Sequence, residues 1–157
     1  MGLPRALKAH GQGDLDQAEH HYKRALEQDV RDPILFQNYG ALLRKRNRDS
    51  EADAMYTRGL ALHPDHIGIL TNRANLLRDS SPAISLACHL RALRLLRHQS
   101  AERIPAEPFI NTISHLRQLG MTQWALALAR ETLRWVGPEA GLLLQCVLLQ
   151  DDVQRSD

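Results

Sequence analysis

Asparagine is the residue type in this chain whose spacing points most directly to chemistry. Asn38 and Asn72 lie 34 residues apart. A carboxamide side chain offers both a hydrogen-bond donor and an acceptor, so it can pair with the backbone of a bound polypeptide whatever that polypeptide's sequence. Amides at a regular interval therefore favour the binding of a polypeptide over a catalysed reaction.

Residue types that serve catalysis or metal binding form no recognisable site. The sequence shows no glycine-rich phosphate loop, nucleophile elbow or pair of catalytic carboxylates. Among the eight histidines, His20 and His21 are adjacent and cannot share a helix face, while His63 and His66 flank the loop that contains Pro64. We predict no enzymatic activity, no cofactor and no metal site, and we expect His63 to interact with the last carbonyls of its helix.

Composition describes an ordinary folded protein. Of 157 residues, 43% are hydrophobic and 24% charged, and the low aromatic content of 4% argues against a β-sandwich or barrel core. A net charge of +2 produces no strong field, so neither nucleic acid nor a membrane is an expected partner. No apolar run has the roughly 18 residues of a membrane helix, and none resembles a signal peptide. Cys88 and Cys146 are expected as small buried residues in a reducing, cytoplasmic setting.

An internal repeat organises the chain. The pattern Ala-x3-Tyr-x2-small-Leu at residues 18–26 recurs at residues 52–60, and Leu-Leu-Arg at residues 42–44 recurs at residues 76–78. A period of 34 residues is typical of stacked helix–turn–helix units. Such a unit cannot bury its apolar face alone, so neighbouring units must stack on one another.

Residues 33–66 form the clearest unit. Phe36-x2-Tyr39-Gly40-x2-Leu43 follows the pattern W-x2-L-G-x2-Y, and Ala52-x3-Tyr56, Gly59 and Pro64 come after it. This order resembles the tetratricopeptide repeat. The resemblance implies an all-α fold, a right-handed α-α superhelix (solenoid) of about four helix–turn–helix repeats and a terminal helix. Residues 1–157 would be one domain with units at about 1–32, 33–66, 67–97 and 106–138, and with the terminal helix at 139–150.

Periodicity and turn residues predict where the helices lie. We expect helix pairs near residues 3–11 and 15–29, 33–46 and 50–62, 67–79 and 82–97, and 107–119 and 122–136. Small residues at Gly40 and Ala52 should let the two helices of one unit cross closely. We also expect Ala52 and Tyr56 to be buried at the junction of the second and third units. Arg73 occupies a position that is usually apolar, which weakens that contact unless its stem reaches out to solvent.

Both ends of the repeat array are irregular. The first helix of the first unit would begin before Met1, so either the natural chain starts inside a unit or upstream residues have been removed. Residues 139–150 are apolar nearly all round, which suggests a helix that is covered on both sides. That segment could be an imperfect cap, the point where a longer protein was cut, or a surface for self-association.

The resemblance also assigns a binding groove. In tetratricopeptide proteins the first helices line a concave groove, with positions 2, 5, 6, 9, 12 and 13 of each unit facing it. Position 6 is Asn38, Asn72 and Asn111, a row similar to the asparagine ladder in the repeat domain of O-linked N-acetylglucosamine transferases. Alternatively, these amides serve only hydrogen bonds between repeats. The candidate peptide-binding residues are Gln37, Asn38, Arg44, Asn72, Asn75, Arg78 and Asn111.

Two further features each have two interpretations, and a third argues against one class of ligand. The basic run at residues 44–48 is either a solvated helix end or a groove rim that attracts acidic partners. Trp124 and Trp135 share a helix face and either pack on the terminal helix or contact a partner. Chaperone-binding relatives grip a C-terminal carboxylate with lysines at positions 2 and 5, but this chain has Ile34, Gln37, Gly68 and Thr71 there, so that clamp is missing.

These observations favour a protein–protein interaction module that binds a polypeptide segment in a concave groove. The alternative is a substrate-recognition repeat domain of a longer transferase, such as a glycosyltransferase, whose catalytic part would lie elsewhere. In both hypotheses the partner is a protein or peptide.

Overall fold

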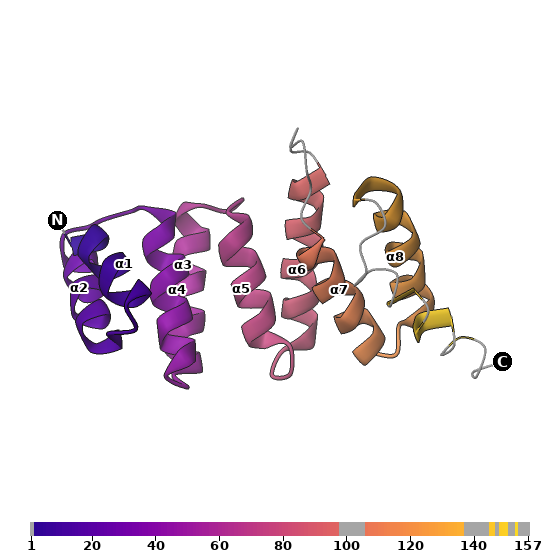
Figure 1. Cartoon of the computed structure of the whole chain (residues 1–157), viewed down its shortest axis with the longest axis horizontal. Coiled ribbons are helices and arrows are strands. Elements are labelled where there is room, and N and C mark those ends of the chain that lie inside the picture. Colours follow the sequence, from indigo (N-terminus) through magenta and orange to yellow (C-terminus); the bar gives the residue numbers. More distant parts are fainter. Residues whose placement is uncertain (1, 98–105, 137–144, 147, 151–152, 154–157) are drawn as a thin grey trace. The chain divides into compact units, whose positions relative to one another are not determined.

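The structure is a computed structural model in which residues 2–97, 106–136, 145–146, 148–150 and 153 are described. Within these residues the chain is helical, with turns between the helices and no strand (Figure 1). It divides into two compact units, Met1–Leu76 and Leu77–Asp157. The helices are α1 (Gly2–Gly11), α2 (Leu15–Glu27), α3 (Pro33–Lys45), α4 (Asp49–Leu62), α5 (Ile67–Leu77), α6 (Pro82–Arg97), α7 (Glu107–Gln118) and α8 (Thr122–Val136).

Local capping explains where several helices begin. The Asp14 carboxylate accepts a hydrogen bond from the Gln17 backbone N–H at 3.0 Å, and the Asp32 carboxylate accepts one from Ile34 at 2.9 Å. Both bonds satisfy amides that have no partner within the helix. Between α7 and α8, Gly120 has φ +73°, a left-handed conformation that glycine adopts without a steric penalty.

The predicted bounds of these eight helices are confirmed to within two residues at each end, and the all-α helical-repeat class is confirmed with them. Of the predicted terminal helix, residues 145–146 and 148–150 are helical. Its other residues lie outside the described part of the chain. The single-domain assignment and the boundaries of the four repeats stay predictions.

In the first unit, α1 packs on α2, α3 packs on α4, and α2 packs on α3. Large side chains fill the core, and Tyr22 stacks on Tyr39 with ring centroids 5.3 Å apart, joining α2 to α3. Burial of Ala52 and Tyr56, both at most 1% exposed, confirms the prediction for α4.

Gly40 explains how closely α3 and α4 approach. A Cβ atom at this position would lie 2.3 Å from Cε1 of Tyr56, far inside van der Waals contact. The bare backbone of α3 therefore makes room for the Tyr56 ring. This contact lies within one repeat and confirms the expected close crossing at Gly40.

In the second unit, α6 packs on α7 and α7 packs on α8. Phe109 and Ile113 are fully buried. Among the described residues of this unit, the buried polar ones are Ser85, His89, Thr112, His115 and Thr132. The Thr112 and Thr132 hydroxyls donate to carbonyl oxygens of their own helices at 2.8 Å and 2.7 Å, so their burial leaves no unpaired donor.

Candidate functional site

The candidate site begins with two asparagines of the first unit. Asn38 on α3 and Asn72 on α5 are both half-buried. The Asn38 Nδ2 donates to the Ile34 carbonyl oxygen at 2.9 Å, a bond within its own helix. A carboxamide has two N–H donors and an oxygen with two lone pairs, so this one bond leaves capacity for a ligand.

Gln37 connects the first helices of two successive repeats. A Cβ atom on Gly68 would lie 2.4 Å from the Gln37 Oε1, so the Gln37 side chain lies directly against the first turn of α5. A side chain at Gly68 would require the flexible end of Gln37 to move. The contact joins α3 to α5, and the role of Gln37 in binding stays a prediction.

Asn111 and Arg78 belong to the second unit. Asn111 on α7 is half-buried, and its backbone oxygen accepts a hydrogen bond from the Arg78 Nη2 at 3.4 Å. Arg78 thus ties the residues before α6 to α7. The structure brings this pair together, whereas Asn38 and Asn72 lie in the other unit. The three-asparagine row rests on the repeat register and stays a prediction.

The other two predicted residues lie in the first unit. Arg44 is exposed near the end of α3, and Asn75 is half-buried on α5. Arg44 is close enough to Tyr56 for its charge to oppose the effect of burial, which raises the pKa of the Tyr56 phenol to about 12. That phenol is therefore a neutral core group at physiological pH.

A polar hollow on α7 adds residues that sequence reasoning missed. It has a volume of about 330 Å³ and is lined by Ser114, Arg117, Gln118 and Gln145. The Gln118 Nε2 donates to Asp79 Oδ1 at 3.1 Å. Ser114 and Arg117 hold positions 9 and 12 of their repeat, the positions of Asn75 and Arg78, so the register that selected Asn111 could have selected them too.

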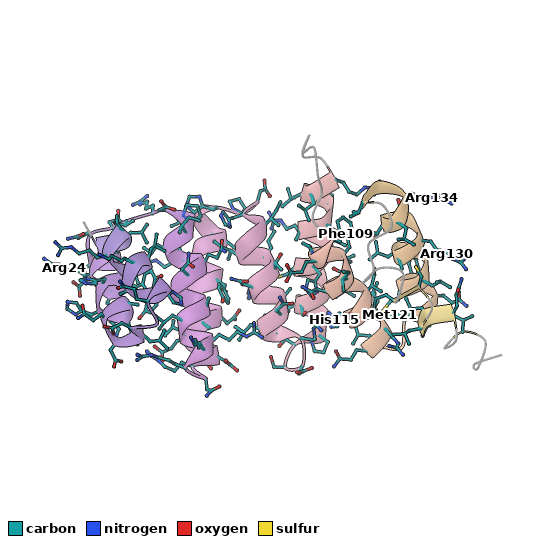
Figure 2. The ribbon with its side chains drawn as sticks, viewed as in Figure 1. Arg24, Phe109, His115, Met121, Arg130 and Arg134 are labelled. Carbon is teal, nitrogen blue, oxygen red and sulfur yellow. The ribbon has the colours of Figure 1, made fainter. Side chains whose placement is uncertain are left out.

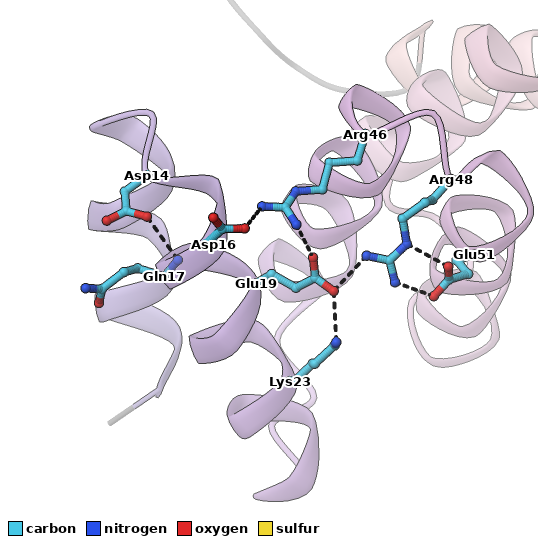
Figure 3. A network of polar contacts seen from close by, with 8 residues as sticks. All are labelled: Asp14, Asp16, Gln17, Glu19, Lys23, Arg46, Arg48 and Glu51. Atoms are coloured by element: carbon cyan, nitrogen blue, oxygen red, sulfur yellow. Dashed lines mark hydrogen bonds and ion pairs between the residues drawn. The ribbon is translucent and has the colours of Figure 1, made fainter.

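The basic run at residues 44–48 has a different role from either of those expected. Figure 3 shows Arg46 and Arg48 reaching Glu19 on α2. The Arg46 Nη1 lies 2.9 Å from Glu19 Oε2, and the Arg48 Nη1 lies 2.8 Å from Glu19 Oε1. Arg46 also contacts Asp16, and Arg48 pairs with Glu51 at 2.6 Å. Both the solvated helix end and the groove rim are therefore corrected for these two arginines, which join α2 to the α3–α4 turn.

Glu19 is the buried centre of this network, with only 6% of its surface exposed. Burial by itself would raise the pKa of Glu19, but hydrogen bonds from Arg48 and Lys23 outweigh that effect and lower the pKa. Glu19 is consequently a permanent anion at neutral pH.

Arg73 is stabilised in a similar way, because its Nε donates to Asp53 Oδ1 on α4 at 2.7 Å. An ion pair thus replaces the apolar contact expected at that position.

The structure bears on two single-residue expectations. The His63 backbone N–H donates to the Gly59 carbonyl near the end of α4, as expected, while its ring Nε2 donates to the carbonyl oxygen of Arg31 in an earlier loop. Trp124 is 70% exposed, so its side chain lies at the surface. The side chain of Trp135 lies outside the described part of the structure.

The remaining observations concern the cysteines, possible metal ligands and membrane-spanning helices. Cys88 and Cys146 are buried, as predicted, and neither belongs to a disulfide. Among the residues that the structure describes, no three histidine, cysteine or carboxylate side chains gather where a metal could bind. No helix in that same part of the chain is long and apolar enough to cross a membrane. The first-helix residues offer amide, hydroxyl and guanidinium groups, which suit hydrogen bonding to a polypeptide.

Several proteins of known structure share this fold. A tetratricopeptide repeat protein from Parabacteroides merdae matches with a TM-score of 0.80 at 23% identity, covering 95% of this chain. This chain spans 57% of that protein's length. No protein-family model matches the sequence, and no curated protein sequence matches it.

Two further matches are peptide-binding proteins. The first repeat domain of Spaghetti (RPAP3), bound to the HSP90 peptide SRMEEVD, matches with a TM-score of 0.64 at 16% identity, covering 74% of this chain and 89% of that one. YrrB, described as a repeat protein with an unusual peptide-binding site, matches with a TM-score of 0.65 at 19% identity, covering 82% and 63%. At these identities the likeness concerns the fold.

Proposed function

We propose that this chain, which has the tetratricopeptide-repeat fold, is a protein-interaction module that holds an extended polypeptide segment along the first helices of its repeats. Asn38, Asn72 and Asn111 would pair with the backbone of that segment. The observation that carries the proposal is their shared state: all three are half-buried side chains at position 6 of a first helix. All three side chains are partly exposed and so reachable by a ligand, and that of Asn38 is also held by a bond to its own helix.

Backbone recognition fits the chemistry of these groups. A carboxamide can accept from a peptide N–H and donate to a peptide carbonyl at once. Because every peptide offers both groups, the interaction tolerates changes in the ligand's side chains. Arg44, Asn75 and Gln37 would lie beside the segment in the first unit, and Arg78 in the second.

Two proteins of this fold support the general class, since one is described with a bound peptide and the other with a peptide-binding site. The residues that would contact the ligand differ in this chain from those of a carboxylate clamp. This chain has Gln37 and Thr71 in place of the lysines that would clamp a terminal carboxylate. The proposed ligand is therefore an internal segment of a polypeptide and not a chain end. Catalysis by the chain itself is no part of the proposal, and its buried cysteines, which form no disulfide, fit a cytoplasmic, reducing location.

A triple variant tests the proposal. In Asn38→Ala, Asn72→Ala, Asn111→Ala, each lost hydrogen bond should weaken binding by about 0.5–1.5 kcal/mol, which together amounts to roughly tenfold or more. Affinity would be measured by fluorescence anisotropy with a labelled unstructured peptide selected from a random library. A second peptide with the same composition in shuffled order should bind with similar affinity.

A matched control uses three exposed polar residues on second helices: Gln17→Ala, Thr57→Ala and Gln123→Ala should leave the affinity unchanged. Helical content of both triple variants would be compared by circular dichroism. We expect no change, because replacing half-exposed amides leaves no buried polar group without a hydrogen-bond partner. Normal binding by the asparagine variant, or loss of binding on shuffling the peptide, would contradict backbone recognition. The hypothesis of a transferase's substrate domain shares this binding mode and stays a prediction.

A further inference from the structure

We propose that an apolar groove between α6 and α8 is a second docking site, whose occupant is an amphipathic helical segment with an acidic end. The groove has a volume of about 430 Å³. Leu86 and Leu90 of α6 form one wall, and Trp124 and Leu128 of α8 form the other. All of these residues belong to the second unit.

Exposure of the groove's apolar residues is the first observation behind the proposal. Trp124 is 70% exposed, Leu90 49% and Met121 37%. Scattered single apolar residues on a surface are normal, but these three line one hollow. Exposed tryptophan in a pocket is also the side chain that most often dominates the binding energy of an interface. The groove therefore has the composition of a contact surface.

Charge at one end of the groove indicates the occupant. Glu131 lines the groove, and the Arg97 Nη2 lies 3.8 Å from its Oε1, which places Arg97 at the edge. Arg94 follows Leu90 by one helical turn on α6, and Arg134 follows Glu131 by one turn on α8. Figure 2 shows Arg134 and Met121 at opposite ends of α8. On the last turns of α6 and α8, three arginines therefore accompany one carboxylate, which leaves positive charge for an acidic partner.

The walls also indicate the occupant's secondary structure. They consist of side chains on α6 and α8, with Leu116 of α7 and Met121 of the turn before α8, so they present no free strand edge with which an extended peptide could pair. A segment that enters an apolar groove must satisfy its own backbone hydrogen bonds, and a helix does so internally. An amphipathic helix can place apolar residues at intervals of three and four along the groove and acidic residues in the turn beside the arginines.

This site is distinct from the one in the proposed function. The groove uses second helices of the repeats, whereas Asn38, Asn72 and Asn111 lie on first helices. Loss of one site should leave binding at the other intact. The two proposals can therefore fail separately.

Selection from a phage-displayed library of helix-stabilised peptides, about four turns long, tests this inference. The enriched peptides should carry apolar residues at helical spacing and acidic residues at one end. Trp124→Ala should weaken the best peptide at least tenfold, and Leu90→Ser should weaken it severalfold. Arg94→Glu with Arg134→Glu should weaken it at low salt and much less at high salt.

Matched comparisons make the result decisive. A version of the selected peptide with lysines in place of its acidic residues should bind more weakly to the natural chain and regain affinity for the Arg94→Glu, Arg134→Glu variant. The triple asparagine variant should bind the peptide normally. The inference is overturned if no peptide is enriched, if affinity is indifferent to Trp124→Ala, or if the lysine peptide binds as well as the acidic one. It is overturned as well if the chain self-associates in sedimentation experiments and Trp124→Ala abolishes that association, because a second copy would then be the occupant.

Discussion

The two compact units of this chain bury polar groups in different ways. Among the described residues, the first unit buries one polar side chain, the Glu19 carboxylate, and surrounds it with the cations of Lys23, Arg46 and Arg48. The second unit buries five polar side chains, and two of them are histidines. Charge neutralisation stabilises the first arrangement, whereas the second requires its histidines to stay uncharged.

The surroundings of the two buried histidines disfavour the protonated form of both rings. His89 and His115 contact each other with ring centroids 5.7 Å apart, and the Ser85 hydroxyl lies 3.2 Å from the His115 Nδ1. Burial, the neighbouring His115 and Arg78 together lower the pKa of His89 to about 4. Burial and Arg78 also lower the pKa of His115, although Asp79 opposes this. Similar repeats can therefore differ in their response to pH.

Truncation of one core aromatic in each unit should give the largest effect. Tyr56→Ala and Phe109→Ala should each cost roughly 3 kcal/mol, because both rings are fully buried. Hydrogen exchange should show faster exchange first within residues 1–76 for Tyr56→Ala and within residues 77–157 for Phe109→Ala. Equal loosening of both units by either variant would mean that the chain unfolds as one block.

Acidification should destabilise the second unit more than the first. Unfolded histidine binds a proton near pH 6.5, whereas His89 in the folded unit does so only near pH 4. The stability associated with neutral His89 is complete above pH 6.5 and is lost as the pH falls toward 4, by about 2 kcal/mol at pH 5. Urea unfolding at several pH values, followed by hydrogen exchange in each unit, would measure this loss.

Controls for the pH effect lie in the same chain. His89→Phe should flatten the pH dependence, while His20→Gln, at an exposed site, should leave it unchanged. In the first unit, burial also lowers the pKa values of His10 and His66, but both are only half-buried, so their contribution should be smaller. Glu19 has a lowered pKa, so its contribution is present above about pH 4.5 and is lost only below that value. An equal loss in both units between pH 6.5 and pH 5 would contradict the comparison.

Removal of the buried charge should give a smaller effect in the first unit. Glu19→Gln keeps the shape of the side chain but leaves Arg46 and Arg48 without their shared anion. We expect a loss of about 1–2 kcal/mol, since both arginines are partly exposed and can turn to water. Lys23→Gln is the control, because that lysine is 57% exposed and should cost less than about 0.5 kcal/mol. Thermal unfolding would compare the stability of the two variants. Equal losses of stability would show that the ion-pair network does not depend on Glu19.

The smallest effect on stability is expected at the apolar groove. Trp124→Ala should change the free energy of unfolding by less than about 0.5 kcal/mol, because the side chain is 70% exposed. Urea unfolding of this variant would show whether the groove is a surface or part of the core. A loss comparable to that of Phe109→Ala would place Trp124 in the core and contradict its docking role.

The sequence by itself determined the helices and much of the packing within each repeat. Helical periodicity, capping residues such as Asp32 and breakers such as Gly120 act over a few residues, so they could be recognised without coordinates. The 34-residue period then identified Gly40 and Ala52 as the small residues of a close helix crossing, whereas the contact of Gly40 with Tyr56 came from the structure. The same register selected the position-6 asparagines, although it could not show that Asn38 donates to Ile34 in its own helix.

Tertiary structure alone decided which distant polar groups meet. Glu19 and Arg48 are 29 residues apart, and His89 and His115 are 26 apart. Whether such groups form an ion pair, share a buried pocket or face water depends on the rotation and separation of packed helices, which no local pattern specifies. Exposure of Trp124 has the same origin, because a helix face is buried only where a neighbour covers it. Local periodicity thus determined the helices. The contacts between helices determined which charged groups pair and which surfaces stay exposed, and these differ between the two units.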